Sequence, residues 1–302
     1  MKRLLVTGAR GFVGRHVVAA GAATGAEVHA VARAAPGKDL PQGEGIIWHA
    51  ADLLTPDQPQ TLLAAIRPSH VFHAAWVTEH GAYWSAPENL DWLAFGARLA
   101  RACLETGIMR LVAAGSCAEY AWGASTLEEG ISAEAPATFY GQMKLAHTRM
   151  LDAVTAAHGL STATGRIFFG YGPHENTARI LPYACQQLAK GEEAAFSTGD
   201  FYRDFMHVED LAAGMVALLQ SDLTGAVNVS SAAPLKLGEI VSRLGEISGR
   251  PDLFRLGARP DRPDDAVYLI GSNARLRTTG WTPRIDLETG LRRTLDWWRD
   301  RV

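Results

Sequence analysis

The sequence predicts an α/β fold, a doubly wound parallel sheet with a smaller C-terminal lobe. Three observations predict it. Short apolar runs of strand length alternate with helical patterns from the N-terminus onward. A glycine-rich turn separates the first run from the first helical pattern, and the alternation stops after Gly170. With 302 residues, the chain is long enough for one large domain or for two unequal lobes around a shared core.

The first three elements are expected to form a βαβ unit. The apolar run at residues 2–7 ends in glycine, which is typical of a buried strand. A helical pattern covers residues 13–23 and ends near Gly25, and a second strand is expected over 27–32. Because strand, helix and strand fit within about 30 residues, the two strands should lie parallel in one sheet.

The alternation then continues for seven more elements. Strands are expected at residues 45–50, 71–75, 110–114 and 162–168, and helices at 61–66, 92–106 and 138–158. Glycine and proline are scattered over 170–204 and 249–265, whereas helices at 208–220 and 237–247 flank a strand at 225–229. We therefore expect a sheet domain of residues 1–165 and 205–230, and a smaller lobe of residues 166–204 and 231–302.

The bulk composition excludes several classes of partner. Hydrophobic residues make up 47% and charged residues 20%, and the formal net charge is -3, so no basic field favours nucleic acid or an anionic membrane. No apolar run reaches the roughly 18 residues that a membrane helix needs. Cys103, Cys117 and Cys185 lack disulfide or metal spacing. They indicate free thiols in a reducing compartment, so we expect a cytoplasmic protein without a metal site.

The glycine-rich turn predicts a dinucleotide site. Gly8, Gly11 and Gly14 lie between the first strand and the first helix with the spacing G-x-x-G-x-x-G. Glycines allow a tight turn and a close approach of the backbone to a pyrophosphate, and the helix N-terminus offers free N–H groups. The alternative is a plain strand-to-helix turn. On the first interpretation, the sheet domain is a dinucleotide-binding domain and the smaller lobe binds substrate.

The end of the second strand favours NADP over NAD. An acidic residue there would bind the adenosine ribose of NAD, but this chain has Ala32, followed by Arg33. Arg10 precedes the second glycine, so two guanidinium groups could meet a 2′-phosphate. If both arginines are ordinary surface charges, they do not select a cofactor, and NAD stays an alternative. Asp52, after the third strand, is placed either to bind the adenine amino group or to cap its own loop.

Tyr140 and Lys144 suggest proton transfer beside that cofactor. An isolated tyrosine has a pKa near 10, and a lysine one helical turn away lies on the same face and should lower it. The pair also arises by chance on helix surfaces, but here it follows a cofactor turn and Ser116 at a strand end. Ser116 would hold the substrate oxygen, or else cap a turn. Cys117 has no evident base partner and is interpreted as packing.

These motifs together resemble the extended short-chain dehydrogenase/reductases, the NAD-dependent epimerase/dehydratase group. The resemblance covers nearly the whole chain and rests on residues 7–14, Asp52 and Leu53, 73–75, 115–120, 140–144, Arg166 with 171–173, 203–211, and 279–283 with 290–291. It implies a Rossmann-type sheet with a C-terminal substrate lobe. Most members of the family act on nucleotide-linked sugars, and many are homodimers.

The resemblance also assigns site residues. The catalytic residues would be Ser116, Tyr140 and Lys144. The cofactor would contact Gly8, Arg10, Gly11, Phe12, Val13, Gly14, Arg33, Asp52, Leu53, Ala74, Ala75, Tyr140 and Lys144. The substrate would contact Thr78, Ser116, Cys117 and Arg203, and His207 and Asp210 would be structural.

Three features depart from the family pattern. Phe169 stands where an asparagine is common, and Trp92 stands where an asparagine often opens the helix after the fourth strand, with Asn89 three residues earlier. The loop 76–84 is rich in aromatic residues. It either shapes the sugar pocket or packs under the second lobe.

The function expected from these features is NADPH-dependent reduction of a nucleotide-linked 4-keto-6-deoxy sugar, with Tyr140 as proton donor. One alternative is a 4-epimerase that retains NAD. A dehydratase is less favoured because only Glu119 offers an extra acid nearby. A non-catalytic NADP-sensing regulator is a third alternative, although such proteins typically lose the tyrosine or the lysine.

Overall fold

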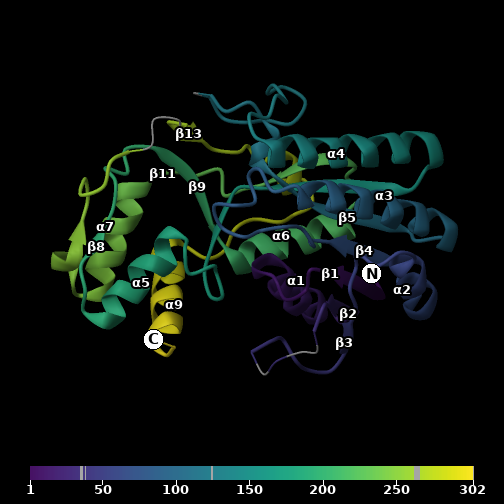
Figure 1. Cartoon of the computed structure of the whole chain (residues 1–302), viewed down its shortest axis with the longest axis horizontal. Helices are drawn as coiled ribbons and strands as arrows, with labels where there is room; N and C mark the ends of the chain where they lie inside the picture. Colours follow the sequence, from purple (N-terminus) through teal and green to yellow (C-terminus); the bar gives the residue numbers. More distant parts are fainter. Residues whose placement is uncertain (35–36, 38, 124, 262–265, 302) are drawn as a thin grey trace.

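The computed structural model describes residues 1–34, 37, 39–123, 125–261 and 266–301, and a seven-stranded sheet is its centre (Figure 1). The strand order is β10-β6-β5-β4-β1-β2-β3, and every pairing in this sheet is parallel. The strands are β1 (Arg3–Thr7), β2 (Glu27–Ala32), β3 (Ile46–Ala50), β4 (His70–His73), β5 (Arg110–Ser116), β6 (Ser161–Ile167) and β10 (Gly225–Val229). The expected doubly wound Rossmann-type sheet is confirmed.

Helices cover both faces of this sheet. On one face lie α1 (Phe12–Ala23) and α6 (Val208–Gln220), and on the other lie α2 (Gln58–Ile66), α3 (Glu88–Thr106) and α4 (Phe139–His158). Alternate residues of a strand point to opposite faces. In β1, Leu4 and Val6 therefore join the first core and Leu5 joins the second.

The strand order reverses between β1 and β4. The chain runs from β1 outward to β2 and β3, then returns to β4 on the other side of β1. In open α/β sheets, ligands bind at the carboxyl ends of the strands at such a switch point. Thr7 at the end of β1 is in register with His73 at the end of β4, so the segments that follow both strands lie side by side.

The smaller lobe has its own core. Figure 1 shows α5 (Ile180–Lys190), α7 (Leu237–Ser248) and α9 (Leu287–Arg299) of this lobe on the left. These helices contribute Leu181, Ile240 and Leu295 to its buried cluster. Its short strands are β7 (Phe169–Tyr171), β8 (Ala194–Ala195), β9 (Tyr202–His207), β11 (Pro234–Lys236), β12 (Phe254–Arg255) and β13 (Tyr268–Leu269). The remaining elements are η1 (Cys117–Glu119), η2 (Pro251–Leu253) and α8 (Ala274–Arg277).

The C-terminal part of the chain does not pack with the smaller lobe alone. Leu276 and Trp281 lie in the core beside α6, and the Trp281 indole donates a hydrogen bond to the Asp210 carbonyl at 3.2 Å. The proposed division of the chain into residues 1–165 with 205–230 and residues 166–204 with 231–302 stays a prediction.

Several helix starts differ from the sequence prediction, and proline is the common cause. The structure begins α2 at Gln58 and α3 at Glu88, not at 61 and 92, and it contains α5 in a stretch expected to be irregular. Pro59, Pro87 and Pro182 lie at or beside the first turns of these helices. Proline is tolerated there because the first N–H groups have no partner within the helix. Throughout the described ranges, no helix is both long and apolar enough to cross a bilayer.

Candidate functional site

The glycine turn lies at the switch point and brings three segments together. Gly8 has φ +67°, and a Cβ there would lie 2.6 Å from the Ala75 nitrogen, inside the contact distance of any real side chain. A Cβ on Gly14 would overlap the Gly8 carbonyl oxygen. The Gly11 N–H donates to that oxygen at 2.9 Å, and Gly11 is the exposed N-cap of α1. These glycines allow close backbone packing within the turn, and binding of a dinucleotide pyrophosphate at the helix N-terminus stays a prediction.

The other predicted cofactor residues surround this turn. Phe12 and Val13 form the first turn of α1 and are half-buried, and Ala74 and Ala75 follow β4. The Ala74 N–H donates to the Thr7 carbonyl at 3.2 Å, which joins the segment after β4 to the end of β1.

The two arginines predicted to bind cofactor, Arg10 and Arg33, are exposed near this turn. A further arginine, Arg15, was not singled out from the sequence. Arg10 lies inside the turn and Arg33 directly follows β2, which ends at Ala32. Arg15, on α1, is buried; its guanidinium lies 3.4 Å from the Asp39 carboxylate and contacts His174 of the smaller lobe. Its position within a regular helix carries no signal in the sequence, because the contacts are with residues far along the chain.

After β3, Asp52 makes the loop-capping contact that the sequence offered as the alternative to adenine binding. The Asp52 carboxylate accepts a hydrogen bond from the Leu54 N–H at 3.1 Å, which is a loop-capping contact. Leu53 is buried in the second core. Binding of adenine by Asp52 therefore stays a prediction.

The three predicted catalytic residues come together at the end of β5. Thr138 caps α4 by accepting a hydrogen bond from the Gly141 N–H at 3.1 Å, which places Tyr140 in the first turn. The Ser116 side chain hydrogen-bonds Tyr140, and its oxygen also accepts from the Ala118 N–H at 3.1 Å. Lys144, one turn later, donates to the Ala114 carbonyl at 2.9 Å. Ser116 thus makes the turn-capping contact considered from the sequence, and its contact with a substrate oxygen stays a prediction.

The protonation of this trio differs from the sequence expectation. Burial raises the pKa of Tyr140, and the Ser116 hydrogen bond only partly opposes it. Burial also lowers the pKa of Lys144 to about 7, against the opposing charge of Glu119. The net shift of the tyrosine pKa is therefore upward, and burial outweighs any lowering by the lysine charge. The physical reason is that the phenol and the amine are both buried away from water, and desolvation disfavours the phenolate and the ammonium alike.

The aromatic loop after β4 packs around Tyr140. The Tyr83 ring lies 4.9 Å from the Tyr140 ring, and the Trp84 carbonyl accepts a hydrogen bond from the Tyr140 N–H at 3.0 Å. Tyr83 also hydrogen-bonds Arg179, the N-cap residue of α5. The loop thus meets both the tyrosine and the smaller lobe, whereas the predicted substrate residue Thr78 is exposed.

Both carboxylate oxygens of Glu119, the acid near Ser116, already accept hydrogen bonds. Glu119 is completely buried and accepts hydrogen bonds from the Ser116 N–H at 2.8 Å, the Thr148 hydroxyl at 2.9 Å and the Arg166 guanidinium at 2.8 Å. Burial raises the pKa of the Cys117 thiol to about 12, so this predicted substrate residue is a neutral packing side chain. The Glu119 carboxylate is therefore engaged by three partners and is not a free acid beside Tyr140.

Arg203 and Phe169 prove to be neighbours. The Arg203 guanidinium donates to the carbonyls of Tyr202 at 2.9 Å and Ala266 at 2.7 Å, and it lies 5.5 Å from the Phe169 ring. Phe169, the departure from the family pattern, thus packs on a predicted substrate residue.

His207 and Asp210 make the contacts of structural residues. His207 caps α6 by accepting from the Glu209 N–H, and the Asp210 carboxylate accepts from the N–H groups of Arg284 and Ile285.

Asn89 lies in the first turn of α3 and is fully buried. It is therefore Asn89, and not the residue at Trp92, that occupies the opening of this helix. The sequence prediction began this helix at residue 92, so Asn89 was left outside it, whereas the structure begins the helix directly after Pro87.

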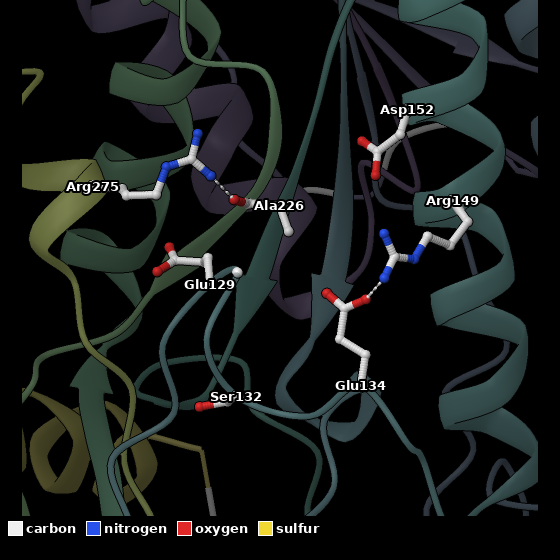
Figure 2. Close-up of a pocket in the computed structure, with 8 residues that line it drawn as sticks. Glu129, Ser132, Glu134, Arg149, Asp152, Ala226 and Arg275 are labelled. Carbon is white, nitrogen blue, oxygen red and sulfur yellow. Dashed lines mark hydrogen bonds and ion pairs between the residues drawn. The ribbon is translucent and has the colours of Figure 1, made fainter.

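A separate hollow lies beside α4 (Figure 2). Its lining residues are Glu129, Gly130, Ser132, Glu134, Arg149, Asp152, Ala226 and Arg275. None of the predicted site residues is among them. Arg149 pairs with Glu134, and Arg275 donates to the Ala226 carbonyl. Across the described part of the chain, no three metal-ligating side chains converge.

Comparison with known proteins assigns the family. The profile of the NAD dependent epimerase/dehydratase family matches residues 4–230, which include the glycine turn and the three predicted catalytic residues. The chain belongs to this family. Its members include NAD-dependent enzymes that modify nucleotide sugars by epimerisation, dehydration or reduction.

Relatives of more than one activity are similar to this chain. UDP-glucose 4-epimerase of Azospirillum brasilense is 31% identical and aligns over 98% of this chain and 92% of its own. GDP-6-deoxy-D-mannose reductase of Pseudomonas aeruginosa is 28% identical over 100% and 98%. GDP-L-fucose synthase 1 of Arabidopsis thaliana is 28% identical, and the match spans only about half of each chain, 54%.

The fold agrees with a solved family structure. Thermus thermophilus UDP-glucose 4-epimerase, solved in complex with NAD, superposes with a TM-score of 0.87 at 26% identity. The superposition covers 99% of this chain and 100% of that one.

Proposed function

We propose that this protein is an NADPH-dependent reductase of a nucleotide-linked 4-keto-6-deoxy sugar. The observation that carries the proposal is the state of Tyr140. Its phenol hydrogen-bonds Ser116 and holds its proton at neutral pH, as any tyrosine does; burial raises the pKa further, so Tyr140 starts as a protonated but weak acid. Reduction of a carbonyl requires a protonated donor at the start, whereas oxidation of a sugar hydroxyl requires a base.

Each residue of the site has a separate role in the proposed reaction. The cofactor, when bound at the glycine turn, would supply a hydride to the carbonyl carbon. Tyr140 gives its phenolic proton to the carbonyl oxygen as that oxygen becomes a hydroxyl. Ser116, which hydrogen-bonds the phenol, is placed to hold the same oxygen. Lys144, one turn along α4, would hold the nicotinamide ribose when the cofactor is bound.

The choice of NADPH rests on the end of β2. The strand ends at Ala32 without a carboxylate, and the guanidinium groups of Arg33 and Arg10 are exposed. Exposed cations near the turn favour the 2′-phosphate of NADP. The choice of a keto sugar over a dehydration substrate rests on Glu119, because its carboxylate is already engaged by Arg166.

The second candidate is a 4-epimerase that retains NAD. The similarity to the Azospirillum brasilense epimerase over nearly the full length of both chains favours it. An epimerase returns the hydride to the sugar and consumes no external reductant, so the two candidates differ in stoichiometry.

The deciding experiment begins with the purified protein as isolated. Denaturation followed by chromatography measures any retained NAD. The protein is then mixed with nucleotide-linked 4-keto-6-deoxy sugars and either NADPH or NADH, and oxidation of the cofactor is followed by absorbance. Faster consumption of NADPH supports the reductase. Stoichiometric retained NAD with interconversion of 4-epimers, and no cofactor consumption, would assign the epimerase. Cofactor binding without turnover of any sugar would favour the regulator.

A further inference from the structure

The ammonium of Lys144 lies against the face of an indole ring. Its Nζ atom is 3.8 Å from the centre of the Trp76 ring, well inside the roughly 6 Å within which a cation is attracted to an aromatic face. Lys144 is 5% and Trp76 is 8% exposed, so the contact is nearly free of water. Desolvated cation–π contacts are the stronger ones.

Trp76 is itself held in place from α3. Its indole N–H donates to the Asn89 side-chain oxygen at 2.7 Å. The Asn89 amide then donates to the carbonyls of Tyr83 at 2.9 Å and Ala86 at 2.7 Å. The first turn of α3 therefore sets the position of the ring, and Asn89 also ties down the loop that packs on Tyr140.

The other titratable groups around Lys144 are either neutral or already paired, so the indole is an important contact of the ammonium. On α4 itself these groups are Tyr140 and His147, from β4 there is His73, and from η1 there is Glu119. Burial lowers the pKa of His147 to about 3 and that of His73 well below its usual value, so both rings are neutral. Glu119 favours the ammonium, but its carboxylate is paired with Arg166.

We propose that Trp76 is a positioning residue of this site, whose indole face keeps Lys144 protonated and directed at the Ala114 carbonyl. Burial lowers the pKa of Lys144 to about 7, so a modest stabilisation of the ammonium decides how much of it is charged at neutral pH. The catalytic consequence rests on the proposed function of Lys144, whereas the contact itself does not.

The test measures the lysine directly. The chain has only five lysines, so lysine labelled with ¹³C at Cε gives a spectrum in which Lys144 is assigned by its loss in Lys144→Arg. Tryptophan is replaced by mono-, di- and trifluorinated analogues, which keep nearly the same shape but weaken the negative face of the ring. The pKa of Lys144 should fall stepwise with fluorination, by a total on the order of one unit.

Two controls separate this contact from the other seven of the eight tryptophans. In Trp76→Phe, fluorinated tryptophan should leave the pKa of Lys144 unchanged. In the natural chain, the signal of Lys236, which lies over the Tyr202 ring, should not respond. An unchanged Lys144 pKa in the fluorinated natural chain, or an equal fall in Trp76→Phe, would overturn the inference.

Turnover supplies a second readout. Trp76→Leu removes the aromatic face and should lower kcat by about 2- to 30-fold, whereas Trp76→Phe keeps a smaller face and should lose less. Equal losses in both variants would also count against the inference. If fluorination shifts the lysine pKa but Tyr140→Phe and Lys144→Met turn over normally, the contact stands and the proposed function fails.

Discussion

Tyr140 is the residue on which the proposed reaction depends most directly. Tyr140→Phe keeps the ring and its packing against Tyr83 but removes the proton donor. General acid–base catalysis is typically worth about 10²–10⁴ in rate, so kcat should fall by about that factor while calorimetry still detects cofactor binding.

Lys144→Met should cost as much or more, because it also removes the ribose contact. The double variant should be far less impaired than the product of the single losses if the two residues act as one unit. Near-normal turnover by Tyr140→Phe with cofactor bound would mean that another residue donates the proton.

At the same scale, Arg33 is predicted to select NADPH over NADH. A charge-assisted contact to the 2′-phosphate contributes roughly 1.5–3 kcal/mol, so Arg33→Ala should weaken NADPH binding by roughly ten- to a hundredfold and hardly change NADH binding. Arg243→Ala on α7, also exposed, is the matched control and should change neither affinity. Calorimetry with both cofactors checks this, and an equal loss for NADPH and NADH would contradict the assignment.

At the scale of the element, the N-cap of α4 links helix stability to the site. Thr138 accepts from the Gly141 N–H, and the first turn that it caps carries Tyr140. Thr138→Ala should lower the free energy of unfolding by about 0.5–2 kcal/mol in urea and reduce kcat as well. Thr138→Ser retains the oxygen and should restore both. A loss of stability that serine fails to recover would exclude the cap as the cause.

Glu175, just before α5, should make the free energy of unfolding depend on pH. One carboxylate oxygen of Glu175 is buried without a hydrogen-bond partner among the residues described, and burial raises the pKa of this group from 4.5 to about 8. Below about pH 4.5, both folded and unfolded chains hold the proton. Between about 4.5 and 8, only the folded chain holds it, so the stability falls as pH rises.

Glu175→Gln carries no such proton. Its melting temperature relative to the natural chain should therefore increase steadily from pH 5 to pH 8 and then level off. Glu44→Gln, at an exposed position, is the control and should show no trend. A constant difference across this range would show that Glu175 is ionised in the folded protein.

At the scale of the whole molecule, the resemblance implies a homodimer, which stays a prediction. Light scattering at micromolar concentration should give twice the mass of one chain. Leu90 on α3 is a large apolar side chain left 53% exposed. If α3 lies in the interface, Leu90→Arg should give single-chain mass with unchanged circular dichroism, and Met109→Arg, at another exposed apolar position, should not. A single-chain mass for the natural protein would overturn the expectation.

The sequence by itself determined the sheet, the glycine turn and the order of the catalytic residues. Strand and helix periodicity, the turn at Gly8 and the spacing from Tyr140 to Lys144 are local, because each depends on residues within one or two turns of backbone. The helices that begin beside proline were the local exception, since proline in a first turn looks like an interruption.

The tertiary structure alone decided the electrostatics of the site. Glu119 meets Arg166 across 47 positions of sequence, and Trp76 covers Lys144 from a different strand end. No pattern within a single segment encodes such contacts. Burial then raises the pKa of Tyr140 and lowers that of Lys144, opposite to the expectation from the pair alone, because desolvation depends on everything that packs around a charge.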